Sequence, residues 1–210
     1  MASKTHICNR ALIKVGKATI SDINTDESPQ GTLCRAVYDA MLVELLRQAE
    51  WNFAVIRQEL NIDASGSPLW EWSYRYILPT IPPIVKIIGV RSEEPFKIEG
   101  QYLVSNQATE ALKYVGKIDD PELYDPLFTE AFVLRIASEI VFSLTPQTSL
   151  VDKLTQAYLF ALANAKNYNS QDDNETPIEE SDWTRARIQG LQTPITFTTI
   201  TAPSNIYSAI

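Results

Sequence analysis

Hydrophobic positions recur with the period of an α-helix in four stretches of the chain. The first stretch covers residues 4–15 and has one apolar face, as expected for a short amphipathic helix. Its apolar positions are Ile7, Ala11, Leu12 and Val15. Ser3 is a suitable N-cap and Gly16 a suitable stop, so both ends of this helix are predicted.

The second stretch covers residues 30–49 and follows a polar loop. Its apolar residues repeat every three or four positions, which predicts a longer helix with one buried face. This face carries Leu33, Val37, Met41 and Leu45, and is widened by Cys34, Tyr38 and Leu42.

The third stretch covers residues 121–144 and is apolar around most of its circumference. It opens on Asp120-Pro121-Glu122, where a proline in the first turn and an acid near the positive end of the dipole favour a helix start. Its polar residues form a narrow stripe of Arg135, Ser138 and Glu139. A helix of this kind is expected to be buried on several sides.

The fourth stretch covers residues 148–168 and begins after a break at Pro146. Its apolar seam consists of Leu150, Leu154, Ala157, Tyr158, Ala161, Ala165 and Tyr168. The seam predicts a last amphipathic helix that packs with one face.

Between the second and third helices, residues 53–116 show short runs with the period of a β-strand. Phe96-Lys97-Ile98 and Gln101-Tyr102-Leu103-Val104 flank the turn residues Glu99-Gly100, which predicts a hairpin. Further strands are expected at 74–78, 85–88 and 112–115. We interpret this region as a small antiparallel sheet inserted into a helical frame.

These elements predict a mainly α fold: a four-helix bundle core with an inserted antiparallel β-region and an extended C-terminal arm. The core covers residues 1–172 and the arm covers 173–210. The arm lacks helical period but is too apolar for a plain solvated tail, so we expect it to order on a partner. A frayed terminus is the alternative.

Candidate partner-binding residues in the arm are Trp183, Arg185 and Arg187. Aromatic and arginine side chains carry a large share of the free energy of protein interfaces. Trp183 could equally pack back onto its own domain.

Charge and composition narrow the class of protein. The chain has a formal net charge of -8 and a pI near 4.7, and its 18 basic residues are scattered. This argues against a dedicated DNA-binding protein, but it suits a surface that DNA passes without adsorbing. No apolar stretch reaches the 18 or so residues of a membrane span, and no signal peptide is expected.

The sequence contains few residues for catalysis or metal binding. His6 is the only histidine, and Cys8 and Cys34 are the only cysteines. We therefore expect no metal, no cofactor and no nucleophile that uses a histidine base. The two thiols are expected to be buried, with a disulfide or redox role as the alternative. The seven glycines are too dispersed for a phosphate-binding loop.

Two further chemical hypotheses stay open at this point. A pair of carboxylates could hydrolyse a glycoside. The candidate acids are Glu50, Glu59, Glu93, Glu94 and Glu99. An aromatic cluster near the start of the β-region could stack on sugars or bases, although packing in the core is the favoured interpretation. Its members are Trp51, Trp70, Trp72, Tyr74 and Tyr76.

Several short segments, in their order along the chain, resemble a known family. They are Asn9-Arg10-Ala11-Leu12-Ile13-Lys14-Val15-Gly16, Trp51-Asn52-Phe53-Ala54 with Arg57, Pro95-Phe96-Lys97-Ile98-Glu99-Gly100 with Ser105-Asn106, Tyr124-Asp125-Pro126-Leu127-Phe128, Arg135-Ile136-Ala137-Ser138-Glu139-Ile140, and Asp182-Trp183 with Arg185-Ala186-Arg187. This series is similar to tail tubular protein A and related head-to-tail adaptors of short-tailed bacteriophages. Each segment alone is weakly specific, and the order and spacing carry the resemblance.

The resemblance implies a structural protein of the virion, made in the host cytoplasm and without catalytic residues. It implies a ring, expected to be a dodecamer, between the portal protein and a tail nozzle similar to tail tubular protein B. Neighbouring copies would form the ring and line part of the channel through which the genome is ejected. The alternatives are another tail-completion protein and a virion-associated cell-wall hydrolase.

Overall fold

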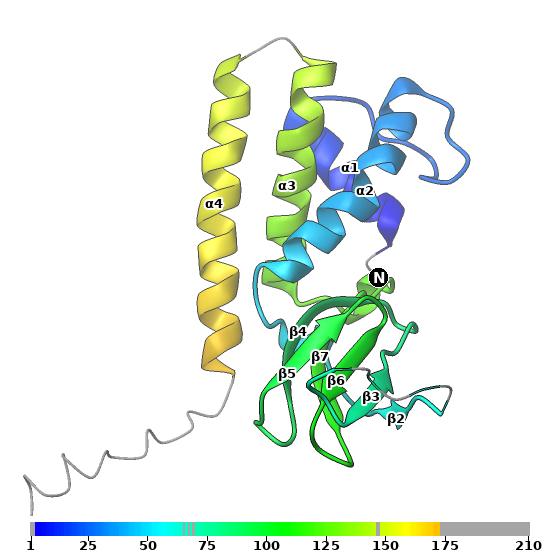
Figure 1. The fold of residues 1–210 in the computed structure, drawn as a ribbon. Coiled ribbons are helices and arrows are strands. Elements are labelled where there is room, and N and C mark those ends of the chain that lie inside the picture. Colours follow the sequence, from blue (N-terminus) through cyan, green and yellow to red (C-terminus); the bar gives the residue numbers. More distant parts are fainter. Residues whose placement is uncertain (1–2, 65, 67, 69, 146–147, 173–210) are drawn as a thin grey trace, which may run out of the picture. The chain divides into compact units, whose positions relative to one another are not determined.

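The computed structural model describes residues 3–64, 66, 68, 70–145 and 148–172. Of these residues about 48% are helical and 20% lie in strands, which form two antiparallel sheets. Within these described ranges four α-helices pack together, and all the strands lie between the second and third α-helix in the chain (Figure 1).

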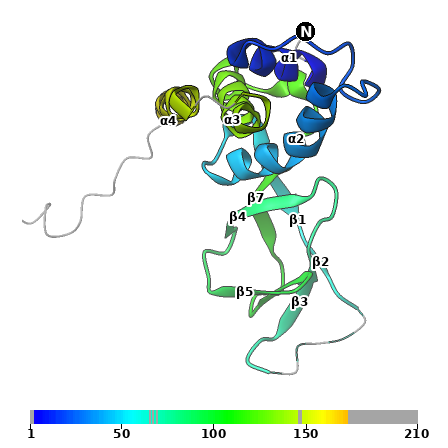
Figure 2. The same ribbon diagram turned by 90° about the horizontal axis from the view of Figure 1, so that it is seen from above.

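The helices are centred on α3. They are α1 (Lys4–Val15), α2 (Pro29–Arg47), α3 (Pro126–Leu144) and α4 (Thr148–Gln171). Helices α1, α2 and α4 all pack against α3, whereas α1 and α2 touch each other little. Figure 2 shows α4 on one side of α3, with α1 and α2 on the other.

The predicted four-helix bundle core is therefore wrong, and the chain has an α+β fold. Helices α1, α2 and α4 each pack on the central helix α3, and the hydrophobic cluster that the four helices share also includes residues of the three-stranded sheet. The β-region is also more than an insertion, because it contains two sheets and has a hydrophobic cluster of its own. Helical periodicity predicted the number of helices but contained no information on which helices pack together.

The helix ends follow from local sequence. Ser3 caps α1, its Oγ accepting a hydrogen bond from the backbone N–H of His6 at 3.1 Å. Gly16 ends α1 with a positive φ of 75°, which glycine adopts at little cost. Both predicted caps are confirmed. The third helix begins later than predicted, because Pro121–Leu123 forms a separate 3-10 turn and Asp125 caps α3.

The described residues contain seven strands, which form two sheets. They are β1 (Val55–Glu59), β2 (Asn61–Ile62), β3 (Tyr74–Ile77), β4 (Ile84–Val90), β5 (Phe96–Glu99), β6 (Tyr102–Ser105) and β7 (Ala111–Gly116). One sheet has the order β1-β7-β4 and the other β2-β3-β6-β5. The predicted hairpin is the β5–β6 pair, whose turn contains Gly100 at a φ of 63°.

The interior contains two hydrophobic clusters. The larger one lies among the four helices and also takes in Val85 and Val115 from the three-stranded sheet. The smaller one lies in the β-region and includes Leu60, Tyr76 and Tyr114. Because the larger cluster contains residues from helices and strands, the two parts form one packed body.

Burial of the helices agrees with the apolar pattern for α3 and differs for α2. The apolar positions predicted to bury α3 on several sides are buried, namely Phe132, Val133, Ile136, Ala137, Ile140 and Val141. In α2, Cys34, Tyr38 and Leu42 are buried, whereas Leu33 and Val37 are only partly buried. Leu45 of the predicted face is also buried, so the buried face of α2 combines Leu45 with the residues that were expected only to widen the seam.

The two cysteines are free and fully buried, Cys8 in α1 and Cys34 in α2. The interaction with Cys34 and the burial of Cys8 both raise the pKa of the Cys8 thiol. A raised pKa keeps the thiol protonated and unreactive, which agrees with the expectation of buried cysteines.

We expect Gly31→Ala to destabilise the protein. Gly31 is buried in the first turn of α2, and a Cβ atom there would lie 2.6 Å from the backbone oxygen of Asp26. Because a backbone atom cannot move aside cheaply, the expected loss is about 1–3 kcal/mol of unfolding free energy in a urea titration. Gly89→Ala is the control, since its added Cβ meets no atom within 4 Å. Equal effects for both variants would contradict the steric argument.

Candidate functional site

The predicted partner-binding residues Trp183, Arg185 and Arg187 lie outside the described residues, as does the whole predicted arm. Their role stays a prediction. The described residues offer another surface, formed by α3, α4 and the end of α1.

Helix α4 leaves apolar side chains in solvent. It buries Leu154, Tyr158 and Leu162, each four residues after the last, as a helix packed on one neighbour does. Phe160 projects from another face and is 71% exposed, and Phe142 at the end of α3 is 73% exposed. Single exposed apolar side chains are common on protein surfaces, and only a contiguous apolar patch indicates a surface that binds a partner.

A groove of about 330 Å³ lies beside Phe160, between α4, α3 and the end of α1. Its lining residues are Lys14, Leu127, Glu130, Leu134, Ala157, Phe160, Ala161 and Asn164. The ammonium of Lys14 pairs with Glu130 at 2.8 Å, and Arg10 pairs with the same carboxylate. Two cations therefore share one carboxylate at this edge, while the groove itself is mainly apolar.

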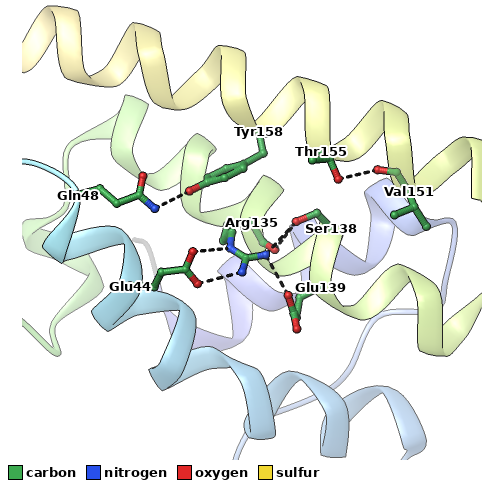
Figure 3. A network of polar contacts seen from close by, with 8 residues as sticks. All are labelled: Glu44, Gln48, Arg135, Ser138, Glu139, Val151, Thr155 and Tyr158. Atoms are coloured by element: carbon green, nitrogen blue, oxygen red, sulfur yellow. Dashed lines mark hydrogen bonds and ion pairs between the residues drawn. The ribbon is translucent and has the colours of Figure 1, made fainter.

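A polar network centred on Arg135 joins α2, α3 and α4 (Figure 3). The guanidinium donates two hydrogen bonds to the carboxylate of Glu44, at 2.9 and 3.3 Å, and one to Glu139 at 3.0 Å. It also lies 5.8 Å from the ring centre of Tyr158, whose hydroxyl accepts a hydrogen bond from Gln48. Arg135 thus connects three helices from the middle of the central one.

The network keeps Arg135 charged and correctly placed. Burial lowers the pKa of the guanidinium, but hydrogen bonds and charge from Glu44 and Glu139 raise it by more. The two parallel bonds to Glu44 form the bidentate geometry that makes arginine–carboxylate pairs strong and directional. The narrow polar stripe predicted on this helix is therefore the face that positions α2 and α4.

Replacing Arg135 with methionine should loosen the packing of α4. The substitution keeps an unbranched apolar stem but removes both carboxylate contacts, so we expect a loss of about 1–2 kcal/mol in unfolding free energy by urea titration. Arg91→Met is the matched control, because its contact with Glu59 is longer, at 3.7 Å, and more exposed. A similar loss in both variants would show that the network adds no more than an ordinary surface pair.

The amide side chain of Asn169 fixes the end of α4 to the loop after α2. Its Oδ1 accepts a hydrogen bond from the backbone N–H of Asn52 at 2.9 Å, and its Nδ2 donates to the carbonyl of Glu50 at 2.9 Å. Asn52 in turn donates to the carbonyl of Asn169 at 3.0 Å. The last described residues therefore lie beside the junction between the helices and the β-region.

The catalytic candidates do not converge within the described residues. Glu50 lies near Lys86 and Lys113, Glu59 near Arg91, and Glu99 near Lys97. Glu93 and Glu94 lie in the exposed turn after β4. His6 is exposed in the first turn of α1, and no group of three possible metal ligands occurs in the part of the chain that the structure describes.

The aromatic cluster of the sequence is divided in the structure. Trp51 and Tyr76 are buried, and the indole N–H of Trp51 donates to the carbonyl of Leu45 at 3.0 Å. Trp72 and Tyr74 are half-buried, whereas Trp70 is 78% exposed. Core packing is thus confirmed for Trp51 and Tyr76 and wrong for Trp70.

Sequence reasoning missed the partners of the α3 stripe and the groove beside α4. Glu44, Gln48 and Tyr158 come from helices far away in the chain, and a single sequence does not pair such positions. The signal for the groove was present, since Phe160 is a large apolar residue that lies off the predicted seam of its helix.

Comparison with protein-family models gives no match, and comparison with curated protein sequences gives none. None of the helices in the described ranges combines the length and apolar character needed to cross a bilayer.

Proposed function

We propose that this chain is a structural head-to-tail adaptor of a tailed bacteriophage, without enzymatic activity. The observation that carries the proposal is the ordered series of short segments, from Asn9 to Arg187, that resembles such adaptors. In this role, copies of the chain form a ring between the portal and the tail nozzle, and the ring would have twelve copies if it follows the adaptors that it resembles.

The surface of α3 and α4 supports this proposal. A single copy leaves Phe160 exposed beside an apolar groove, and Leu159 of α4 and Phe142 of α3 are also exposed. Burying such side chains against a neighbour is favourable, by roughly 25 cal/mol for each Å² of apolar surface removed from water. When one patch binds a different patch on the next copy, the contact repeats around an axis and closes into a ring.

The charge of the chain also suits the proposed role. With a net charge of -8, a channel lined by such subunits would repel the phosphate backbone of DNA. Repulsion lets a genome slide through without tight adsorption. The protein would then belong to the virion neck, although it is made in the host cytoplasm.

The test is the mass and shape of the purified protein, alone and mixed with the portal ring of the same phage. Light scattering should show a larger species after mixing, and negative-stain images should show a second ring with a central hole stacked on the portal. A protein that remains monomeric and does not bind the portal would overturn the adaptor function. A peptidoglycan-release assay would then test the hydrolase alternative.

A further inference from the structure

Trp70 is exposed to solvent at a constrained turn of the β-region. It lies in the connection between β2 and β3, and its exposed fraction is 78%. The N–H of Trp72 donates to the carbonyl of Trp70 at 2.7 Å, and the N–H of Ser73 donates to Oδ1 of Asn106 at 3.0 Å. Glu71, between the two tryptophans, has a φ of 61°, a left-handed conformation that is uncommon for residues other than glycine. The backbone thus fixes the turn that carries this large apolar side chain into solvent.

The side chains on this turn have the composition of an interface anchor. Tryptophan is one of the residues that contribute most free energy to protein interfaces, where it typically fills a pocket on the partner. Glu71 beside it is exposed and forms no ion pair with another described residue. The turn therefore presents one aromatic ring and one unpaired negative charge.

The groove beside α4 complements this turn in both properties. Its volume of about 330 Å³ and its mainly apolar lining, which includes the exposed Phe160, suit a single aromatic side chain. At its edge Arg10 and Lys14 share the one carboxylate of Glu130, so this edge has one positive charge in excess. A ring that enters the groove is removed from water, and an acid beside that ring would meet the positive charge.

The turn and the groove lie on different sides of one copy. Helix α4 and the strands β2 and β3 that flank the turn lie on opposite sides of the molecule in both ribbon views (Figure 1 and Figure 2). Trp70 therefore does not reach the groove of its own copy, whereas it can enter that of a neighbour. A contact between two different patches repeats around an axis, which is the geometry that closes a ring.

We propose that Trp70 of one copy binds in the groove beside α4 of the next copy, with Glu71 facing Lys14 at the edge. The indole ring contacts Phe160 and the apolar walls of the groove. This inference rests on the proposed ring and specifies the two surfaces that meet in it. The occupant of the groove is thus a second copy of this chain.

Cross-linking between two full-length variants tests the contact directly. Ser73→Cys places a thiol near Trp70, and Asn164→Cys places one in the lining of the groove. A short bismaleimide should join the two variants in a mixture, both at high protein concentration and in rings assembled on the portal, and should join neither variant to itself. The native Cys8 and Cys34 are fully buried, so they do not compete for the reagent.

Two further variants control for chance encounters and for the role of the indole ring. Thr80 is exposed like Ser73 but follows β3 instead of preceding it, so Thr80→Cys should not be joined to Asn164→Cys. Adding Trp70→Ala to the Ser73→Cys variant should lower the yield of cross-linked dimer by about tenfold or more, because the anchor of the interface is lost. Since Trp70 is 78% exposed, this substitution removes little packing within the subunit.

Reversal of charge tests the edge of the groove. Glu71→Lys in the Ser73→Cys partner, or Lys14→Glu in the Asn164→Cys partner, should each lower the yield by about threefold or more, because like charges would then face each other. With both changes present the yield should recover, since opposite charges meet again. Losses that simply multiply would overturn the placement of Glu71 beside Lys14.

The outcomes for this contact and for the adaptor function are separate. An absence of the cross-link, both in concentrated protein and on the portal, would overturn the contact, as would an equal yield with Thr80→Cys or with Trp70→Ala. Rings that form on the portal without the cross-link would leave the adaptor function standing. Conversely, a cross-link in concentrated protein that does not bind the portal would support the contact and overturn the adaptor function.

Discussion

Replacing Phe128 with alanine should reduce the unfolding free energy by about 3–5 kcal/mol, the range for removing a fully buried aromatic side chain. Phe128 lies in the first turn of α3 and is completely buried. Its ring centre lies 4.9 Å from that of Trp51 and 4.9 Å from that of Phe53, both in edge-to-face geometry. It also contacts Tyr124 at 5.3 Å.

The size of this effect follows from the position of Phe128. Trp51 and Phe53 belong to the segment between α2 and β1, so the ring connects the central helix with the start of the β-region. Removing it leaves a cavity among rigid aromatic neighbours that collapse poorly. Since natural domains are stable by only about 5–15 kcal/mol, the variant should be close to unfolding at ordinary temperature.

Urea or thermal unfolding, followed by circular dichroism, measures this effect. Phe142→Ala is the matched control, because it removes the same ring from the same helix at a position that is 73% exposed. The control should change the unfolding free energy by no more than about 0.5 kcal/mol. If the two variants were equally stable, the aromatic contacts of Phe128 with Trp51, Phe53 and Tyr124 would not stabilise the packing of the helices against the β-region.

The sequence predicted local structure well wherever one short segment determined it. Ser3 and Gly16 bound the first helix because capping depends only on neighbouring backbone groups. The β5–β6 hairpin was predicted because Gly100 lies between two alternating runs. The burial of α3 was predicted because its apolar residues leave only a narrow polar stripe.

Arrangement in space was not predictable in the same way. Strand β7 pairs with both β1 and β4, which lie far from it in sequence, and the register along β4 shifts at two irregularities. Helix α4 packs on α3 through a seam whose pattern would suit a bundle equally well. Which distant strands pair and which helices pack together depends on how well their complete surfaces complement each other. The local pattern in a single sequence does not contain this information, and it favoured the wrong architecture.

The candidate sites show the same limit. A narrow stripe containing Arg135 was visible in the sequence, but its carboxylate partner Glu44 lies 91 residues away in another helix. The buried acid Glu110, which is 2% exposed, also gave no signal in the sequence, because its burial results from the packing of strands around it. Exposed acids are common, and only the structure distinguishes this one from the rest.

If α3 and α4 form the contact between subunits, Phe160→Asp should prevent assembly on the portal while the subunit stays folded. Phe160 is 71% exposed, so the change removes little internal packing. In an assembled ring the new carboxylate would be buried against the neighbour without a partner, at a cost of several kcal/mol for each contact. Because an n-fold ring contains n copies of one contact, the penalty recurs around the whole assembly.

Ile81→Asp is the matched control. Ile81 is 86% exposed and lies between β3 and β4, so the control adds the same charge at an equally exposed apolar position in the β-region. Circular dichroism should show both variants folded, and light scattering with the portal should show a ring for Ile81→Asp alone. Assembly of Phe160→Asp would move the subunit contact away from α4. Loss of assembly in Ile81→Asp alone would move it to the β-region, and in either case the adaptor proposal itself would stand.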